Sequence, residues 1–206
     1  MKVLLLNGSP HEKGCTYTAL AEIAKTLQAD GVESDILWLG TGPTAGCTAC
    51  GACRELGKCA HDDAVNLAAE KMAGCDGLIV GSPVHYAAAS GQITCALDRL
   101  FYSAGGAMRL KPAAAIVSAR RAGTTAALDQ LNKYFTISQM PVVSSRYWNM
   151  VHGSCPEDVL QDEEGMAVMR TLAHNMAWLL RCIEAGRAAG VPSPAVEPPA
   201  RTNFIR

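Results

Sequence analysis

Apolar residues occur along the chain as short continuous runs that alternate with longer segments of helical periodicity. Runs that are apolar throughout are typical of strands buried on both faces of a parallel sheet. The runs predict strands at 2–6, 34–39, 77–82, 113–118 and 141–143. The periodic segments predict helices at 16–29, 62–73, 91–102, 124–138 and 158–190, the last with a weak point at Gly165. Residues 147–156 are predicted to form an irregular loop.

Strands that alternate with helices indicate βαβ units, which connect parallel strands by right-handed crossovers. The pattern therefore predicts an α/β fold, a doubly wound parallel sheet with helices on both faces. All 206 residues fit one large domain. We expect this domain to span 1–190, with a cysteine-rich insert at 46–60, and an extended, proline-rich tail at 191–206.

Composition narrows the class of protein. Hydrophobic residues make up 49% of the chain and the net charge is −1, so nothing favours nucleic acid or a membrane surface as a partner. The chain shows neither a signal-peptide pattern nor an apolar stretch of about 20 residues. Its nine cysteines then point to reduced thiols, metal ligands or redox chemistry. These features lead us to expect a cytoplasmic protein.

The first predicted strand ends abruptly in the sequence NGSPHEKGCT, which reads as a tight loop followed by a helix start. Backbone N–H groups at a helix N-terminus are unpaired and favour an anion. Ser9, Thr16 and His11 add further donors, and Gly8 and Gly14 permit close approach of the backbone. The loop lacks the glycine-lysine ending of a P-loop and the G-x-G-x-x-G dinucleotide motif. It predicts a phosphate site; an ordinary capped βα turn is the alternative.

Two further predicted strands also end in loops rich in glycine, proline and small polar residues. These loops are GSPVHY after the third strand and SARRAGT after the fourth. Ligands of doubly wound sheets bind beyond the carboxyl ends of the strands, where the strand order reverses. We therefore expect the three loops to form one ligand site.

Four cysteines follow the second strand with the spacing C-x2-C-x2-C-x5-C: Cys47, Cys50, Cys53 and Cys59. Short spacings place several thiolates around one small centre, as in the cysteine runs that bind iron–sulfur clusters. Zinc fits less well, because structural zinc sites usually pair two separated cysteine knuckles. A metal-free cysteine loop remains the alternative. Because the segment follows a strand, we expect it near the ligand edge of the sheet.

The three strand-end segments resemble the flavodoxin-like, NAD(P)H-dependent FMN reductase family. GSPHEKGCT resembles its phosphate loop, and GSPVHYAAASGQITCALDR its isoalloxazine-binding segment; with SARRAGTTAALDQL, the resemblance covers nearly the whole chain. It implies a five-stranded parallel sheet in the order 2-1-3-4-5. It implies that the FMN phosphate is held by Ser9, His11, Gly14, Cys15 and Thr16. It implies that the flavin ring is lined by Pro83, Val84, His85 and Tyr86, and approached at its other edge by Ser118, Arg121, Gly123 and Thr124.

Two residues depart from the family pattern. His11 stands where the family usually has Arg, which weakens charge pairing with the phosphate at high pH. His85 stands where the usual Tyr follows Pro-Val, and Tyr86 comes one place later, so which aromatic side chain meets the ring is open.

The cysteine segment, with ACGACR, resembles the iron–sulfur flavoproteins, which join a 4Fe–4S cluster to FMN on a flavodoxin-like fold. All four cysteines match at the same spacing. The resemblance implies that Cys47, Cys50, Cys53 and Cys59 are the cluster ligands, if a cluster is bound.

The resemblance implies an FMN-dependent oxidoreductase that passes hydride from NAD(P)H through FMN to a quinone, a flavin or a similar acceptor. No residue is an obvious general acid or base, and Arg121 is the candidate for tuning the flavin. The alternative is an electron carrier for redox proteins, or a thiol or flavin redox sensor, without nicotinamide turnover. We expect a homodimer or higher homo-oligomer, because Tyr147, Trp148, Phe204 and Ile205 offer apolar groups outside the sheet core.

Overall fold

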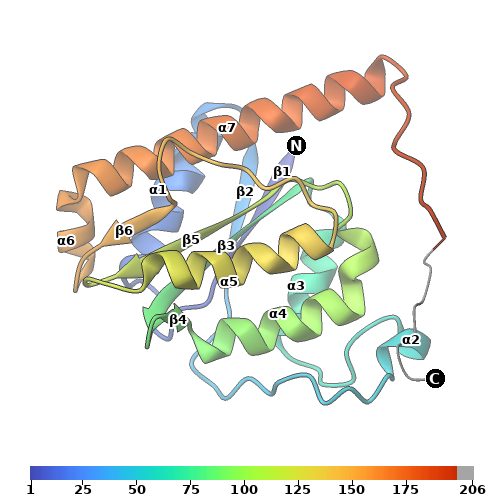
Figure 1. Ribbon diagram of the computed structural model, residues 1–206, viewed down its shortest axis with the longest axis horizontal. Coiled ribbons are helices and arrows are strands. Elements are labelled where there is room, and N and C mark those ends of the chain that lie inside the picture. The colour runs from blue at the N-terminus through green and yellow to red at the C-terminus, as the bar shows by residue number, and fades with distance from the viewer. Residues whose placement is uncertain (199–206) are drawn as a thin grey trace, which may run out of the picture.

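A six-stranded sheet forms the centre of the computed structural model, which describes residues 1–198 (Figure 1). Five strands run parallel in the order β2-β1-β3-β5-β6, and the short β4 pairs antiparallel with β3. Their bounds are Lys2–Asn7 for β1, Glu33–Trp38 for β2, Gly77–His85 for β3, Ala88–Ala89 for β4, Ala113–Ala119 for β5 and Met150–His152 for β6. The predicted flavodoxin-like fold is confirmed.

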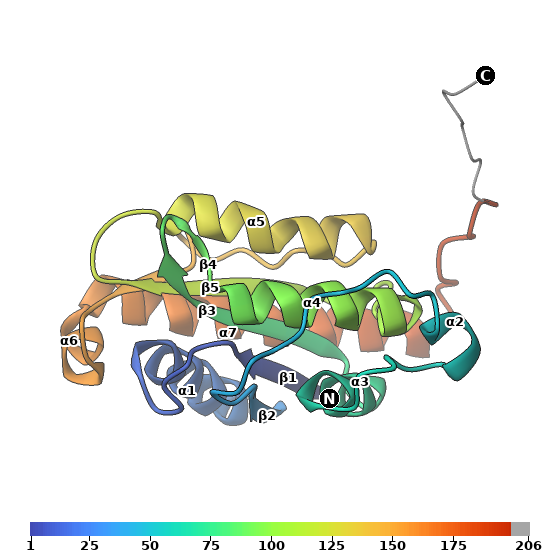
Figure 2. The same ribbon diagram turned by 90° about the horizontal axis from the view of Figure 1, so that it is seen from below.

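Helices cover both faces of the sheet (Figure 2). One face packs against α1 (Cys15–Ala29) and α7 (Glu163–Ala188), and the other against α3 (Ala64–Ala73), α4 (Gly91–Ala104) and α5 (Thr124–Ile137). The strand period of two explains this division: Val3 and Leu5 of β1 face the first pair, and Leu4 the second group. Residues 1–198 contain three further, short helices: α2 (Cys53–Leu56), the 3-10 helix η1 (Gly105–Ala107) and α6 (Pro156–Gln161).

The fifth parallel strand is β6, so its predicted location at 141–143 is wrong. Val142 forms only an isolated parallel bridge with Ala113, at the start of β5. The chain then leaves the sheet and rejoins it at Asn149, whose side-chain Nδ2 donates to the carbonyl of Ala115. The Val117 backbone N–H donates to the Asn149 carbonyl. A polar stretch therefore interrupts the strand, which resumes in the segment predicted as an irregular loop.

The predicted helix at 158–190 is two helices, α6 and α7, and the break lies at Asp162 rather than at Gly165. Asp162 is the N-cap of α7, and its Oδ1 accepts the Gly165 backbone N–H at 2.9 Å. A Cβ built at Gly165 would lie 2.3 Å from Asp162 Oδ2. Gly165 is therefore the residue that lets the cap approach, and it lies inside the first turn of α7.

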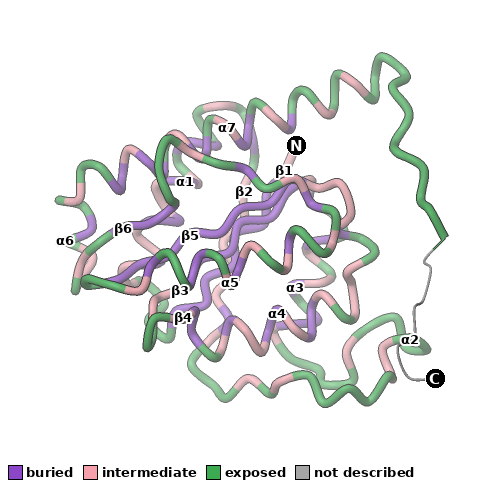
Figure 3. Tube along the Cα trace, viewed as in Figure 1, coloured by how far each residue is buried: buried purple, intermediate pink, exposed green. Residues whose placement is uncertain are grey.

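The prediction that the cysteine segment lies near the ligand edge of the sheet is wrong. The segment runs along α4 to the opposite end of the molecule (Figure 1). Near the start of α4, Gln92 Nε2 donates to the Gly40 carbonyl at 2.6 Å. Near its end, the Cys53 thiol contacts the Tyr102 carbonyl at 3.8 Å. Most of residues 40–60 are exposed or half-buried (Figure 3). The predicted insert at 46–60 thus lies on the surface, against the second half of α4.

Residues 191–198 carry no helix or strand, and Arg109 Nη2 donates to the Pro194 carbonyl at 3.0 Å. The rest of the predicted tail, with Phe204 and Ile205, lies outside the described residues. Across residues 1–198, none of the helices combines the length and the apolar character needed to cross a bilayer.

Candidate functional site

The three predicted strand-end loops meet at one edge of the sheet. Thr16, in the first turn of α1, and Ser118, near the end of β5, share a hydrogen bond of 2.8 Å between their hydroxyls. Both residues are buried, at 1% and 3% exposure. The first loop also contacts the segment after β3, because Ser90 Oγ donates to the Gly8 carbonyl at 2.9 Å. The expected convergence of the loops is therefore present.

The loop after β1 is fixed by its own polar side chains. Asn7 is fully buried; its Oδ1 accepts the Ser9 N–H at 3.1 Å and its Nδ2 donates to the Glu12 carbonyl at 2.9 Å. The Ser9 hydroxyl accepts the His11 N–H at 3.1 Å, while the His11 side chain is exposed. Trp38, at the end of β2, donates its indole N–H to the Ser9 carbonyl at 2.8 Å. Hydrogen bonds within the loop and one from β2 therefore fix its conformation.

The N-terminus of α1 offers backbone donors without a competing side chain. Gly14 is its N-cap, with no side-chain cap hydrogen bond, and the first turn contains no acidic residue. The Cys15 thiol contacts the Gly153 carbonyl at 3.7 Å, and burial raises the pKa of this thiol. Cys15 therefore faces β6 with its side chain and contributes only its backbone N–H to the loop side. This arrangement suits an anion such as a phosphate.

The second loop is a hairpin that the sequence pattern did not predict. Strand β3 continues through Pro83 and Val84 to His85, and β4 folds back to pair with it. The two turn residues, Tyr86 and Ala87, have φ angles of 51° and 59°. Such turns usually carry Asn-Gly, because side chains other than those of Gly, Asn and Asp are strained at positive φ. Tyr86 is fully exposed at the tip of the hairpin.

The third loop packs directly against this hairpin. Gly123 has φ +93°, and a Cβ built on it would lie 2.6 Å from Ala87 Cα. Thr124 follows as the first residue of α5 and is buried, whereas the Arg121 side chain is exposed. The structure thus brings the thirteen predicted FMN residues to one edge of the sheet. There His11, His85, Tyr86 and Arg121 are exposed, and Ser9, Thr16, Ser118 and Thr124 are buried.

Four residues that support this edge were not predicted as site residues: Asn7, Trp38, Ser82 and Ser90. The Ser82 hydroxyl accepts the Ser90 N–H at 2.9 Å, and Ser90 also caps α4 by accepting the Ile93 N–H. Asn7 and Ser82 are polar residues in otherwise apolar strand runs, and this feature of the sequence could have identified them as residues that support the site. Nothing in the sequence pattern indicates the partners of Trp38 or Ser90.

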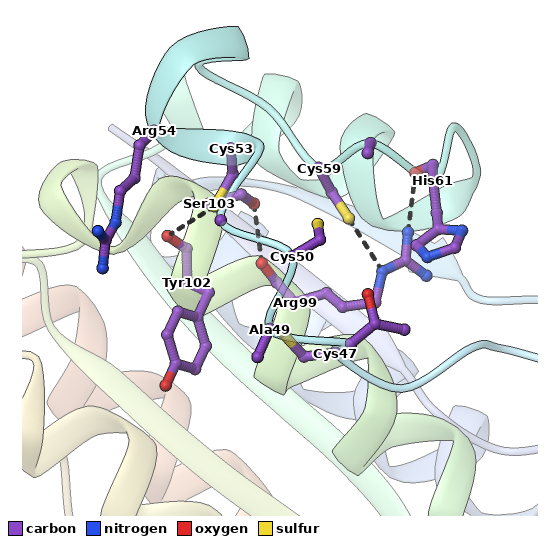
Figure 4. Close-up of a pocket in the computed structure, with 13 residues that line it drawn as sticks. Cys47, Ala49, Cys50, Cys53, Arg54, Cys59, His61, Arg99, Tyr102 and Ser103 are labelled. Carbon is purple, nitrogen blue, oxygen red and sulfur yellow. Dashed lines mark hydrogen bonds between the residues drawn. The ribbon is translucent and has the colours of Figure 1, made fainter.

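A second candidate site lies at the other end of α4. All four predicted metal ligands, Cys47, Cys50, Cys53 and Cys59, line one cavity of about 230 Å³ (Figure 4). Arg99, Tyr102 and Ser103 of α4 form its other wall. A hydrogen bond from the Ala52 backbone and one from the Thr48 side chain lower the pKa of Cys50, which favours its thiolate.

The donor set of this cavity fits a soft metal centre, because four thiols from one short segment border the same space. Residues 1–198 nevertheless contain no group of three His, Cys, Asp or Glu side chains placed together closely enough to hold a metal ion. Cys47 and Cys50 are exposed, whereas Cys53 and Cys59 are half-buried. Binding of a metal centre would therefore require the four thiols to move closer together.

Comparisons with known proteins agree with this architecture. The model of the family described as NADPH-dependent FMN reductase matches residues 1–154. The chain is 30% identical over 198 residues to an iron-sulfur flavoprotein of Methanocaldococcus jannaschii, covering 89% of this chain and 100% of that protein.

Solved structures show the same fold at low sequence identity. The structure of RosB with the bound intermediate 8-demethyl-8-formylriboflavin-5'-phosphate has a TM-score of 0.70 at 14% identity, covering 100% of this chain and 94% of that one. A flavodoxin from the domain Archaea has a TM-score of 0.60 at 12% identity, covering 88% of this chain and 99% of that one. The chain belongs to the NADPH-dependent FMN reductase family and, within it, to the iron–sulfur flavoprotein branch.

Proposed function

We propose that the protein is an FMN-dependent oxidoreductase that oxidises NAD(P)H and passes the electrons to a small acceptor such as a quinone or a free flavin. The observation that carries this proposal is the meeting of three polar loops at the carboxyl edge of the sheet, linked by the Thr16–Ser118 hydrogen bond. Membership of the NADPH-dependent FMN reductase family supports the same activity. FMN supplies the hydride and single-electron chemistry when it is bound.

The chain's own groups bind and orient the cofactor. The backbone N–H groups of the first turn of α1 and the hydroxyls of Ser9 and Thr16 would hold the phosphate, with His11 at the rim. The hairpin with Pro83, Val84, His85 and Tyr86 would line one side of the ring. The loop with Ser118, Arg121, Gly123 and Thr124 would lie at the other side, where the Arg121 charge would favour a reduced, anionic ring.

Replacing Ser9 and Thr16 together with alanine should weaken FMN binding. Each lost hydrogen bond to a charged phosphate is worth roughly 1.5–3 kcal/mol. Fluorescence titration of the apoprotein with FMN measures the change. Thr26→Ala is the matched control, because Thr26 is another buried threonine of α1 but bonds the Glu22 carbonyl, far from the loop. Equal FMN affinity in the double variant and the control would contradict this phosphate site.

Turnover tests the function itself. Purified, FMN-loaded protein is mixed anaerobically with NADH or NADPH, and the loss of flavin absorbance is followed before and after a quinone is added. Rapid bleaching by one of the nucleotides, and rapid return on addition of the quinone, is the expected result. Bleaching by dithionite but by neither nucleotide would refute the reductase proposal.

A second candidate function is electron transfer through a cluster, with redox proteins as partners. The observation that favours it is the cavity bordered by four thiols. In this case a reduced ferredoxin-like carrier would reduce the protein quickly, and nicotinamides would do so slowly. The same anaerobic experiment, with a reduced ferredoxin as the donor, distinguishes the two functions.

We also propose that the protein works as a homodimer. Tyr147 and Trp148 remain half-exposed, at 53% and 54%. Their rings pack edge to face, with the ring centroids 4.7 Å apart. Sedimentation velocity at micromolar concentration should show a dimer, and replacing both residues with serine should weaken it. Trp178→Ser is the control, since Trp178 is an exposed tryptophan of α7. A wild-type monomer with FMN still tightly bound would contradict the dimer.

A further inference from the structure

Cys59 is held by the folded domain, whereas the exposed Cys47 and Cys50 are not buried against it. The Cys59 backbone N–H donates to Asn66 Oδ1 at 3.0 Å, and its carbonyl accepts from Asn66 Nδ2 at 3.0 Å. Its sulfur accepts a hydrogen bond of 3.2 Å from Arg99 Nε (Figure 4). The main chain and the side chain of Cys59 are therefore both fixed.

Arg99 is itself locked in place. Its side chain is 1% exposed, although arginine is rarely buried without a partner. Nη1 and Nη2 donate to the two Asp63 carboxylate oxygens at 2.7 and 2.9 Å, and Nη2 also donates to the His61 carbonyl at 2.8 Å. The bidentate pair occupies the far end of the guanidinium and leaves the Nε–H aimed at Cys59.

The ion pair keeps both groups charged. Burial alone would raise the pKa of Asp63, but the hydrogen bonds from Arg99 and from the Val65 N–H outweigh it, and the pKa is lowered. The hydrogen bond to Asp63 raises the pKa of Arg99, against the effect of burial. Asp63 is also the N-cap of α3, so the pair ties the segment before α3 to the middle of α4.

Asn66 completes the support from α3. It is buried, at 4% exposure, and its Nδ2 also donates to the His61 carbonyl and to Asp62 Oδ1. One amide therefore bonds main-chain or side-chain atoms of Cys59, His61 and Asp62. Together with Arg99, it makes residues 59–63 a rigid part of the domain.

We propose that Arg99 is a positioning residue of the four-cysteine site, holding the Cys59 sulfur as the fixed corner on which the other three thiolates close around a metal centre. This inference rests on the cluster-binding half of the proposed function and adds to it a residue outside the cysteine motif. The charge-assisted N–H···S bond draws electron density from a ligand sulfur. Hydrogen bonds to the sulfurs are among the features that set the potential of iron–sulfur centres.

Lysine cannot take over this role. It keeps the positive charge, but its single ammonium lacks the planar fork that reaches Asp63 and Cys59 at the same time. Arg99→Lys therefore tests the N–H···S bond without removing the charge. Arg54→Lys is the matched control, because Arg54 lines the same cavity from α2 but points away from Cys59 (Figure 4).

The experiment uses full-length protein reconstituted anaerobically with iron and sulfide. Arg99→Lys should hold iron roughly 10- to 100-fold more weakly, the loss of affinity typical when outer-sphere partners of metal ligands are removed, and should release it faster to a chelator. The reduction potential of the centre should become more negative. Arg54→Lys should match the wild type in both measurements.

A purely structural role for Arg99 makes a different prediction. Asp63→Asn removes the ion pair and weakens the packing of Arg99, but leaves the guanidinium beside Cys59. Its thermal midpoint should fall, while the potential of its centre should not become more negative. Equal downward shifts of the potential in Asp63→Asn and Arg99→Lys would overturn the inference, as would equal behaviour of Arg99→Lys and Arg54→Lys.

Failure of the proposed function can be separated from failure of this inference. If reconstituted wild-type protein holds no iron and sulfide, the cluster half of the function fails, and Cd²⁺ replaces iron as the probe. Cd²⁺ should then bind at least tenfold more weakly to Arg99→Lys than to Arg54→Lys. Equal affinities, or no binding of Cd²⁺ by the wild type, would overturn the role of Arg99. If reconstituted wild-type protein holds iron and sulfide but binds no FMN, only the flavin proposal is refuted.

Discussion

Replacement of Gly123 with alanine should lower the free energy of unfolding by about 3 kcal/mol. Two causes act together at this position. The backbone has φ +93°, where a Cβ is strained, and that Cβ would lie 2.6 Å from Ala87 Cα and 2.9 Å from Ala87 Cβ. Ala87 cannot easily move aside, because it already has φ +59° in the two-residue turn between β3 and β4. Urea denaturation of the purified apoprotein measures the change.

Gly91→Ala is the control for this substitution. Gly91 is the first residue of α4, and a Cβ built there meets nothing within 4 Å. Its replacement should be neutral or stabilising by about 0.4–1 kcal/mol, since alanine restricts the unfolded chain. Because the hairpin and the loop at Gly123 form the proposed ring site, Gly123→Ala should also bind FMN more weakly. Wild-type stability in Gly123→Ala would show that the two loops do not pack as described.

Removing one cysteine of the cavity should abolish most of the bound iron. We expect anaerobically prepared protein to contain iron and sulfide at about four per chain, the content of a 4Fe–4S centre with four cysteine ligands. Cys53→Ala should lose most of this iron, because a cluster needs all its thiolates around one centre. FMN should stay bound, since the phosphate loop lies at the other end of α4. Iron and sulfide assays and the flavin absorbance measure the iron, sulfide and FMN content per chain.

Cys75→Ala supplies the comparison within the same chain. Cys75 is buried at 3% exposure among apolar side chains and does not line the cavity. The iron content of the Cys75→Ala variant should equal that of the wild type. Protein that carries FMN but neither iron nor zinc would show that the four cysteines form a metal-free loop. The cluster proposal would then fail, and the reductase proposal would stand.

The layers of the fold could be predicted from the sequence because they rest on local patterns. The apolar run at β1 is buried on both faces, and Leu20, Ile23 and Leu27 give α1 one buried stripe. The meeting of the three loops could be predicted for the same reason, since each loop follows directly on its strand. Thr16 and Ser118 are far apart in the chain but meet because parallel strands end at one edge.

The features that could not be predicted depend on contacts between distant segments. Strand β6 is only three residues long, and it pairs with β5 next to the point where the Asn149 side chain bonds the Ala115 carbonyl. The path of the cysteine segment depends on α4, through Gln92 and Arg99. Arg99 looks like an ordinary helix residue in the sequence, and only the fold shows that it is buried against Cys59.

Helix α4 also sets the distance between the two candidate sites. Ser90 at its start bonds the phosphate-loop segment, and Arg99 further along bonds Cys59, which puts about 14 Å of helix rise between them. A unit charge gained at one site would change the energy of a charge at the other by only about 1 kcal/mol at an effective dielectric constant of 20. Salt screens this interaction further, because the Debye length at physiological ionic strength is about 8 Å. For a one-electron couple, 1 kcal/mol corresponds to about 40 mV before screening. Reduction of one site should therefore shift the potential of the other by a few tens of millivolts at most.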